Sequence, residues 1–294
     1  MPATGPAGIG VIDTHLGIPP RDKASTYGFF RDMLKDAGSQ DMEFPAEYMF
    51  RDYPTYEGET DMVAFVLRNM DDVGIEKGLI NLRRIDTDPN VRRAHDDHAD
   101  RFFFCYSIDP HEGMDGVRAL QRFREQYGIK AAIAFPAGMN PPIPIDDRKF
   151  YPYYAKCVEL DIAVCVTAGV PGPRLPFASQ KVELIDRVCY DFPELRFVTR
   201  HGCEPWTDLA VKLLLKWPNL YYSTSAFAPK YYPKAIVDFA NTRGADKVIY
   251  AGYFPDGLSL QRIFDEMPHV PFRDHVWPKF LRENAVRVFQ LDKD

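Results

Sequence analysis

The chain has 294 residues, of which 46% are hydrophobic and 27% are charged. These values fit one large α/β barrel or two smaller domains, and they exclude a chain that is disordered throughout. The formal net charge of −6 argues against a dedicated nucleic-acid binder and against a membrane contact through basic residues. No apolar run approaches the roughly 20 residues of a membrane span, and the first ten residues lack the features of a signal peptide.

Eight short apolar segments predict β-strands, at residues 9–12, 77–82, 102–108, 129–135, 162–167, 195–199, 220–223 and 248–251. Segments of helical spacing follow them, for example residues 114–127, where Gly128 stops the helix. Repeated alternation implies a parallel sheet, and eight units predict a (β/α)8 TIM barrel that uses residues 1–294 as a single domain. An open, doubly wound sheet is the alternative, but no Gly-x-Gly-x-x-Gly follows the first strand.

A long excursion, about residues 18–60, separates the first predicted strand from the next helix. It is rich in aromatic residues: Tyr27, Phe29, Phe30, Phe44, Tyr48, Phe50, Tyr53 and Tyr56. Because loops of this length inside a compact domain are usually functional, we expect an insertion that acts as a lid or a partner surface. Packing of the aromatic rings against the barrel rim is compatible with a lid, and exposed rings are compatible with a homodimer.

Five cysteines are scattered along the chain without a Cys-x-x-Cys spacing. An odd, scattered set predicts reduced and mostly buried thiols in a cytoplasmic protein, rather than a disulfide framework. Cys203 follows His201 by two residues and could be either a nucleophile or a filler in a tight turn; we favour the filler.

Polar residues follow the predicted strands, where the carboxyl ends of a parallel barrel hold its ligands. The first strand leads to Asp13 and His15, and the sixth leads to Arg200, His201 and Glu204. The other strand ends supply Arg83, Phe135, Thr167 and Tyr253, and a proline-rich loop after the fifth strand supplies Arg174.

Several motifs in this order resemble the amidohydrolase superfamily, and more narrowly its aminocarboxymuconate semialdehyde decarboxylase-like branch. They are Ile12-Asp13-Thr14-His15, His201-Gly202, residues 224–235 and residues 283–289. The resemblance covers nearly the whole chain and implies a metal site, from which this sequence departs. The second histidine of the family's His-x-His motif is Gly17 here, the strand-5 histidine is Thr167, and the strand-8 aspartate is Tyr253. Since a catalytic zinc needs three protein ligands, we expect no metal and no cofactor.

Without a metal, side chains must activate the nucleophile. We expect His201, Asp13, Glu204 and Tyr253 to be catalytic: His201 transfers protons, Asp13 or Glu204 orients an imidazole, and Tyr253 donates to an oxyanion. We expect Arg200, His15, Thr167, Arg174, Arg83 and Phe135 to contact the substrate, with the arginines clamping a carboxylate or phosphate. Alternatives stay open for three of these residues: Arg83 could be solvated, Arg174 could pin its own loop, and Tyr253 could pack at the rim.

These expectations favour a metal-independent hydrolase that cleaves a C–C bond, an ester or a thioester in a small, cyclic or aromatic carboxylic acid or an acyl thioester. One alternative is a metal-dependent decarboxylase or hydrolase of the same superfamily, with His15, His201 and unusual ligands. The other is a catalytically inactive barrel that binds a ligand or partner, which predicts a closed, apolar strand-end face.

Overall fold

The computed structural model describes residues 8–20, 27–28, 31–42, 44, 46–51 and 53–292. Eight parallel strands pair in sequence order from β1 to β8, so the predicted (β/α)8 barrel is confirmed. The strands are β1 Val11–Asp13, β2 Ile75–Asn81, β3 Phe102–Ser107, β4 Ala131–Ala134, β5 Ala163–Thr167, β6 Phe197–Arg200, β7 Leu220–Ser223 and β8 Val248–Ile249.

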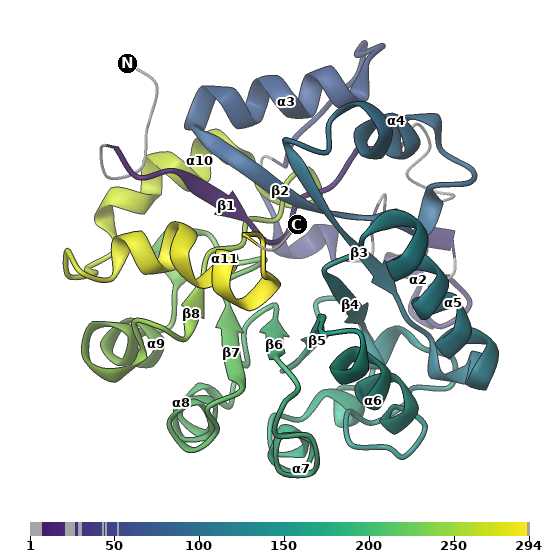
Figure 1. The fold of residues 1–294 in the computed structure, drawn as a ribbon. Helices are drawn as coiled ribbons and strands as arrows, with labels where there is room; N and C mark the ends of the chain where they lie inside the picture. The colour runs from purple at the N-terminus through teal and green to yellow at the C-terminus, as the bar shows by residue number, and fades with distance from the viewer. Residues whose placement is uncertain are drawn as a thin grey trace.

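Most of the helices surround this ring of strands, as Figure 1 shows. They are α2 Ala37–Gln40, α3 Met62–Val73, α4 Pro89–Asp97, α5 Gly113–Tyr127, α6 Tyr151–Glu159, α7 Leu184–Asp191, α8 Thr207–Lys216, α9 Lys234–Phe239, α10 Leu260–Glu266 and α11 Asn284–Phe289. Short caps fix several boundaries: the Asp61 side chain accepts from the backbone N–H of Ala64 at the start of α3, and Gly74 ends that helix with φ +77°.

Side chains inside the barrel form a separate cluster from those between the strands and helices. Ile12, Leu79, Phe103, Cys165 and Val198 belong to this inner cluster. Helix α11 lies across one end of the barrel (Figure 1) and adds Ala285, Val288 and Phe289 to the same cluster. The Phe289 ring packs 5.6 Å from that of Phe103, near the start of β3. The amino ends of the strands are therefore plugged by α11, which leaves the carboxyl ends as the face for a ligand.

The barrel closes between β1 and β8 with few backbone bonds, and a carboxylate contributes to the seam. The backbone N–H of Gly252 donates to Asp13 Oδ1 at 2.9 Å, and the backbone N–H of Thr14 donates to the Tyr250 carbonyl at 3.4 Å. A Cβ on Gly252 would lie 2.6 Å from Asp13 Oδ2, so only glycine fits this close approach. The predicted strand at residues 248–251 is only two residues long, β8 Val248–Ile249. Beyond it, the Asp13 side chain rather than a backbone carbonyl of β1 accepts the hydrogen bond from Gly252.

The described part of the excursion packs on the carboxyl face of the barrel through aromatic rings. Phe44 contacts the rings of Tyr27, Phe50 and Tyr53 at centroid distances of 6.4, 6.0 and 5.3 Å. Phe50 in turn stacks on Tyr253 beyond β8, at 5.3 Å. Phe29 and Phe30, part of the predicted aromatic set, lie outside the described residues.

All five cysteines are buried and none forms a disulfide. Burial raises the pKa of the Cys203 thiol to about 12, so it is protonated at neutral pH and suits a filler better than a nucleophile. No helix within the described ranges has the length and apolar character that a membrane crossing requires.

Candidate active site

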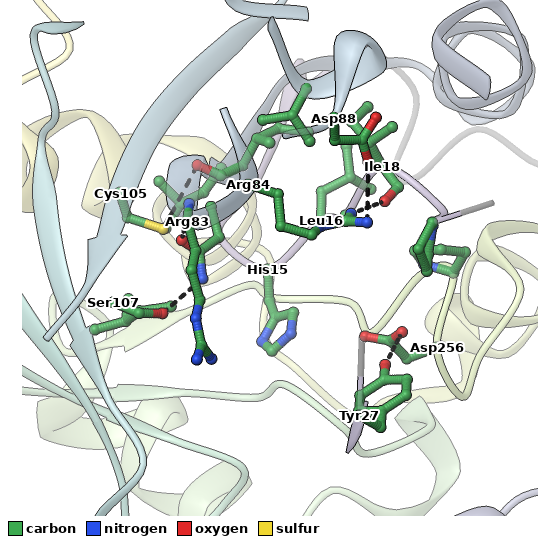
Figure 2. Close-up of a pocket in the computed structure, with 18 of the residues that line it drawn as sticks. His15, Leu16, Ile18, Tyr27, Arg83, Arg84, Asp88, Cys105, Ser107 and Asp256 are labelled. Atoms are coloured by element: carbon green, nitrogen blue, oxygen red, sulfur yellow. Dashed lines mark hydrogen bonds and ion pairs between the residues drawn. The ribbon is translucent and has the colours of Figure 1, made fainter. Parts of the chain in front are cut away.

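A cavity of about 750 Å³ lies at the carboxyl ends of β1, β2 and β3, and Figure 2 shows its lining. His15 and Leu16 after β1, Asn81 and Arg83 at the end of β2, and Arg200 from β6 are parts of its wall. On another side, the Tyr27 hydroxyl of the excursion donates to Asp256 Oδ1 at 2.5 Å, and both residues line the cavity. The size suits a small organic molecule.

Arg200 and His15 form the polar centre of this wall. Arg200 is the last residue of β6, and its Nη2 lies 3.0 Å from His15 Nε2 and in contact with Nδ1. Burial lowers the pKa of His15 well below its usual value of 6.5, and the nearby charge of Arg200 lowers it further, followed by His201. The imidazole of His15 is therefore neutral at pH 7 and accepts a hydrogen bond from the guanidinium.

His201 lies next to this pair in an unusual backbone conformation. Its φ of +61° is in the left-handed region, which non-glycine residues adopt rarely, and its backbone N–H donates to Ser225 Oγ at 2.9 Å. The His201 ring lies 4.9 Å from that of His15, and its Nδ1 is buried without a hydrogen-bond partner in the described part of the chain. Burial, and then Arg200, lower the pKa of His201 well below 6.5, so this imidazole is neutral too.

Tyr253 completes a group of three rings. Its centroid lies 5.1 Å from that of His15 and 5.2 Å from that of His201, both edge-on. Burial raises the pKa of the Tyr253 phenol, and the negative charge of Asp256 raises it further, so the hydroxyl keeps its proton. A protonated phenol beside two neutral imidazoles can donate a hydrogen bond to a negatively charged oxygen.

Asp13 lies behind these rings and is completely buried. Its Oδ1 accepts from the backbone N–H groups of His15 and Gly252, both at 2.9 Å, so it fixes the chain beside His15 and Tyr253. Its Oδ2 is buried near the Tyr250 hydroxyl and lacks a hydrogen-bond partner in the described structure. Burial raises the pKa of Asp13 to about 7, although the two N–H groups and Tyr250 lower it.

The two arginines that follow β2 point in different directions (Figure 2). Arg84 Nη1 pairs with Asp88 Oδ2 and its Nη2 donates to the Ile18 carbonyl, both at 2.9 Å, so its guanidinium anchors the loop after β1. Arg83 is exposed, and its guanidinium reaches into the cavity near His15. Asn81 supports this turn by accepting from the Arg83 backbone N–H and donating to Ser107 Oγ.

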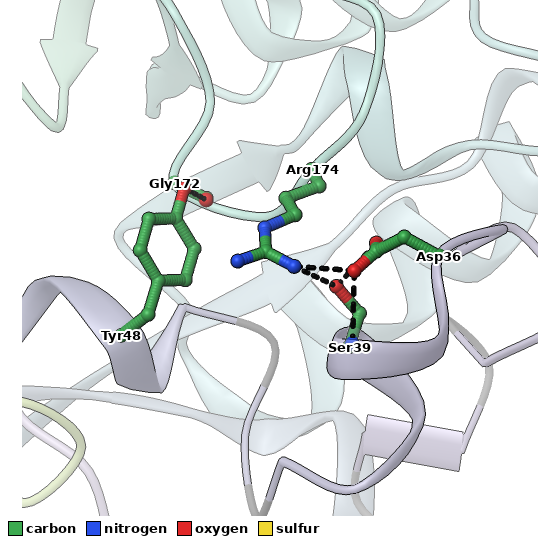
Figure 3. Close-up of polar contacts among 5 residues, drawn as sticks. All are labelled: Asp36, Ser39, Tyr48, Gly172 and Arg174. Atoms are coloured by element: carbon green, nitrogen blue, oxygen red, sulfur yellow. Dashed lines mark hydrogen bonds and ion pairs between the residues drawn. The ribbon is translucent and has the colours of Figure 1, made fainter.

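Two predicted substrate contacts, Arg174 and Phe135, lie on the excursion side of the face. Arg174 pairs with Asp36, and its guanidinium lies 4.8 Å from the centroid of the Tyr48 ring (Figure 3). The Tyr48 hydroxyl donates to the Gly172 carbonyl at 2.7 Å. The excursion and the proline-rich loop after β5 are therefore joined at two places, by this hydrogen bond and by the Arg174–Asp36 pair. Phe135 packs against the small cluster of Leu34, Ala137 and Leu175. Neither side chain is part of the wall of the cavity of Figure 2.

The exposure of the Arg174 pair leads to a first prediction. The two side chains are 44% and 40% exposed, and ion pairs at such sites contribute little to stability because water screens them. Replacing Arg174 with Met should therefore leave the midpoint of urea denaturation nearly unchanged. It should change substrate affinity by less than about threefold, because the guanidinium already binds Asp36. A tenfold loss of affinity would place Arg174 in the substrate site.

Thr167 and Glu204 complete the set of predicted site residues. Thr167 is buried at the end of β5, paired in register with Arg200. Glu204 is exposed beyond β6, with its pKa raised by partial burial, and neither His15 nor His201 contacts its carboxylate. The structure thus brings Asp13, His15, Arg200, His201 and Tyr253 together, and Thr167 lies in register with Arg200. Of these residues His15 and Arg200 line the cavity, as Arg83 does, whereas Asp13, Thr167, His201 and Tyr253 are not part of its wall. Glu204, Arg174 and Phe135 stand outside this group.

The residues at this centre do not fit a divalent metal ion. Within the described ranges, no three His, Cys, Asp or Glu side chains lie close enough together to hold one. The ring nitrogens of His15 contact a guanidinium, whose positive charge opposes a second cation. Thr167, Gly17 and Tyr253 supply poor ligands where the resemblance predicts histidine and aspartate.

Several cavity residues were not predicted as site residues, although a signal existed for Ser107. It ends β3, two positions after the inner-cluster residue Cys105. The two-residue period of a strand therefore turns its side chain inward at the carboxyl end. Asp256 carries no such signal, because it reaches the cavity through a loop beyond β8.

A parallel barrel with its polar groups gathered at the carboxyl ends defines a (β/α)8-barrel enzyme. The chain belongs to the amidohydrolase family, whose sequence profile matches residues 12–291. This membership makes the protein a hydrolase or lyase, and it confirms the resemblance to the amidohydrolase superfamily.

Solved structures of similar fold cover nearly the whole chain at low sequence identity. An uncharacterized TIM-barrel protein from Bordetella bronchiseptica is 22% identical, with a TM-score of 0.72 over 96% of this chain and 99% of its own. The 5-carboxyvanillate decarboxylase of Novosphingobium aromaticivorans, solved with bound manganese, is 17% identical, with a TM-score of 0.66 over 96% and 97%. The 2,6-dihydroxybenzoate decarboxylase from Rhizobium is 16% identical, with a TM-score of 0.62 over 97% and 99%. No curated protein sequence matches the chain.

Proposed function

We propose that the protein is a metal-independent hydrolase that cleaves a C–C bond, an ester or a thioester in a small carboxylic acid or acyl thioester with a cyclic or aromatic body. The observation that carries this proposal is the contact of Arg200 with the neutral His15 at a cavity wall. Arg200 is partly shielded from water, and its guanidinium contacts His15 rather than a carboxylate in the described part of the chain. A partly buried cation without a counter-ion is costly, which favours an anionic ligand.

In this proposal His201 transfers protons, because its neutral imidazole can accept a proton from water. The water attacks a carbonyl carbon, the bond to the leaving group breaks, and the protonated imidazole returns its proton to that group. Tyr253 donates a hydrogen bond to the oxygen that becomes negative, and Arg200 and Arg83 hold the carboxylate. Asp13 orients the chain on which His15 and Tyr253 lie, and the excursion at residues 18–60 covers the substrate as a lid.

A chelation experiment separates this proposal from a metal-dependent reaction. The assay offers cyclic β-keto acids, aryl esters, acyl thioesters and hydroxybenzoates, and monitors hydrolysis products and carbon dioxide. We expect hydrolysis at a rate that EDTA leaves unchanged, from enzyme with less than about 0.1 divalent ion per chain, since a catalytic metal needs a ligand set that this centre lacks. Loss of turnover with EDTA and its return with manganese would contradict metal independence.

The metal-dependent decarboxylase is the second candidate, because two similar structures carry decarboxylase names and one of them holds manganese. Carbon dioxide release from a hydroxybenzoate in the same assay would favour it. A catalytically inactive barrel receives less support, because it predicts a closed apolar face, whereas a cavity lined by His15 and Arg200 lies there.

A further inference from the structure

Arg200 presents two hydrogen-bond donors along one side of its guanidinium, the Nε–H and Nη2–H groups. One of them has a hydrogen-bond partner and the other has none. Nη2 contacts the ring nitrogens of His15. Nε is buried and has no hydrogen-bond partner in the described structure. The contact with His15 therefore provides a partner for only one of the two donors. The other costs free energy, because a buried donor without a partner has lost its hydrogen bonds to water.

We propose that the Nε–Nη2 edge of Arg200 is the binding site for a carboxylate of the ligand, and that His15 occupies this edge while the site is empty. The proposal rests on the proposed function, which places an anion near Arg200. The new part is that Nε and Nη2 of Arg200 bind the anion, and that His15 contacts Nη2 when no anion is bound.

The geometry of the edge matches a carboxylate. The two N–H bonds of a guanidinium edge are parallel and bind both oxygens of one carboxylate at once. A carboxylate would therefore replace the neutral imidazole on Nη2 and give Nε the partner that it lacks. Because the carboxylate carries a negative charge and the imidazole of His15 does not, the exchange adds an attraction between opposite charges to the hydrogen bonds, and it favours the anion over His15.

The charges around the edge favour an anion as well. Five titratable groups lie close enough to Arg200 for its charge to lower their pKa values: His15 after β1, Cys105 on β3, Cys165 on β5, His201 after β6 and Tyr253 after β8. Both histidines and the phenol are neutral at pH 7, and the two thiols keep their protons, so none of the five carries a negative charge that could pair with Arg200 in place of a ligand. Of the carboxylates in the cavity wall, Asp88 pairs with Arg84 and Asp256 accepts from the Tyr27 hydroxyl.

The other arginine of the cavity shows the opposite arrangement. Arg84 uses Nη1 for Asp88 and Nη2 for the Ile18 carbonyl, so its guanidinium has its partners within the fold. Leu16, Leu79 and Ile133 contribute apolar side chains to the same cavity as Arg200. We therefore infer a ligand with one planar carboxylate attached to a cyclic or aromatic body, rather than a free phosphate.

Isothermal titration with benzoate tests the carboxylate site in the full-length protein. We expect benzoate to bind and neutral benzamide, its isostere, to bind at least ~10-fold more weakly, because it lacks the charge. Arg200→Lys keeps the positive charge but loses the edge, and should weaken benzoate binding at least ~10-fold. The matched change Arg84→Lys, at the cavity arginine that Asp88 and the Ile18 carbonyl already hold, should weaken it less than ~3-fold. A larger loss in Arg84→Lys than in Arg200→Lys would overturn the assignment, and so would tighter binding of inorganic phosphate than of benzoate.

A second variant tests the role of His15. If the imidazole occupies the edge, His15→Leu removes the competitor and should bind benzoate ~3-fold to ~10-fold more tightly, the size of one lost hydrogen bond. Weaker binding in this variant would show that His15 assists the anion instead, and would overturn that part of the proposal. A thermal melt confirms that each variant is folded before titration.

These binding experiments need no turnover, so the two proposals can fail separately. Benzoate binding at Arg200 without hydrolysis of any assayed class would leave the carboxylate site in place and remove the proposed function. Hydrolysis that continues in Arg200→Lys with an unchanged KM would remove the carboxylate site and leave the proposed function.

Discussion

Replacing His201 with asparagine is expected to lower turnover at least ~100-fold, the usual loss when a general acid or base is removed. Asparagine is the informative substitution because it tolerates the left-handed backbone that His201 adopts at φ +61°. It keeps the backbone N–H that donates to Ser225 Oγ, so the loss should report proton transfer rather than misfolding. Steady-state kinetics on the substrate found in the assay above measure the effect.

Exposed His275 provides the matched control, because His275→Asn makes the same change outside the site and should leave turnover within about twofold. The pH profile adds a second measurement. Since burial and Arg200 hold the pKa of His201 well below 6.5, the imidazole stays neutral as pH falls from 8 to 6.5, and turnover should decline only at lower pH. Turnover in His201→Asn close to that of the wild type would remove His201 from the mechanism.

Most of the fold could be predicted because parallel strands buried on both faces appear as short, continuous apolar runs. The predicted strand at residues 220–223 has the same bounds as β7 Leu220–Ser223, and the one at 162–167 differs from β5 Ala163–Thr167 by one residue. β8 Val248–Ile249 is shorter than predicted, because a side chain from the far end of the chain joins the seam. No local pattern encodes that contact.

The site was harder to predict, because alternation places a residue at a strand end without fixing the direction of the loop that follows. Arg83 and Arg84 are adjacent in sequence, yet the Ile18 carbonyl and Asp88 hold Arg84 while Arg83 reaches the cavity. Glu204 follows His201 by three residues and is exposed. Arg174 pairs with Asp36, 138 positions away. Each outcome depends on contacts between distant parts of the chain, which a single sequence does not reveal.

Replacing Asp13 with alanine is expected to lower the free energy of unfolding by about 3 kcal/mol, because two buried N–H groups lose their acceptor. These are the backbone N–H group of His15, in the turn after β1, and that of Gly252, whose hydrogen bond to Asp13 joins β1 to the segment after β8. Asp13→Asn keeps an acceptor oxygen at the same place and should lose much less. Urea denaturation at pH 5 compares the two variants with the wild type; equal stability of Asp13→Ala and the wild type would contradict a structural role at the seam.

The stability and the turnover of Asp13→Asn together separate a positioning role of Asp13 from a catalytic one. Burial raises the pKa of Asp13 from 3.8 to about 7, so its contribution to stability is complete below pH 3.8 and is lost as pH rises through 7. The wild type should therefore lose about 1.4 kcal/mol of stability per pH unit relative to Asp13→Asn between pH 5 and pH 7, and the difference should level off at higher pH. Because Asp13 acts through the backbone of His15 and Gly252, turnover of Asp13→Asn should stay within about tenfold of the wild type. A loss of ~100-fold with unchanged stability would instead identify Asp13 as a group that transfers a proton.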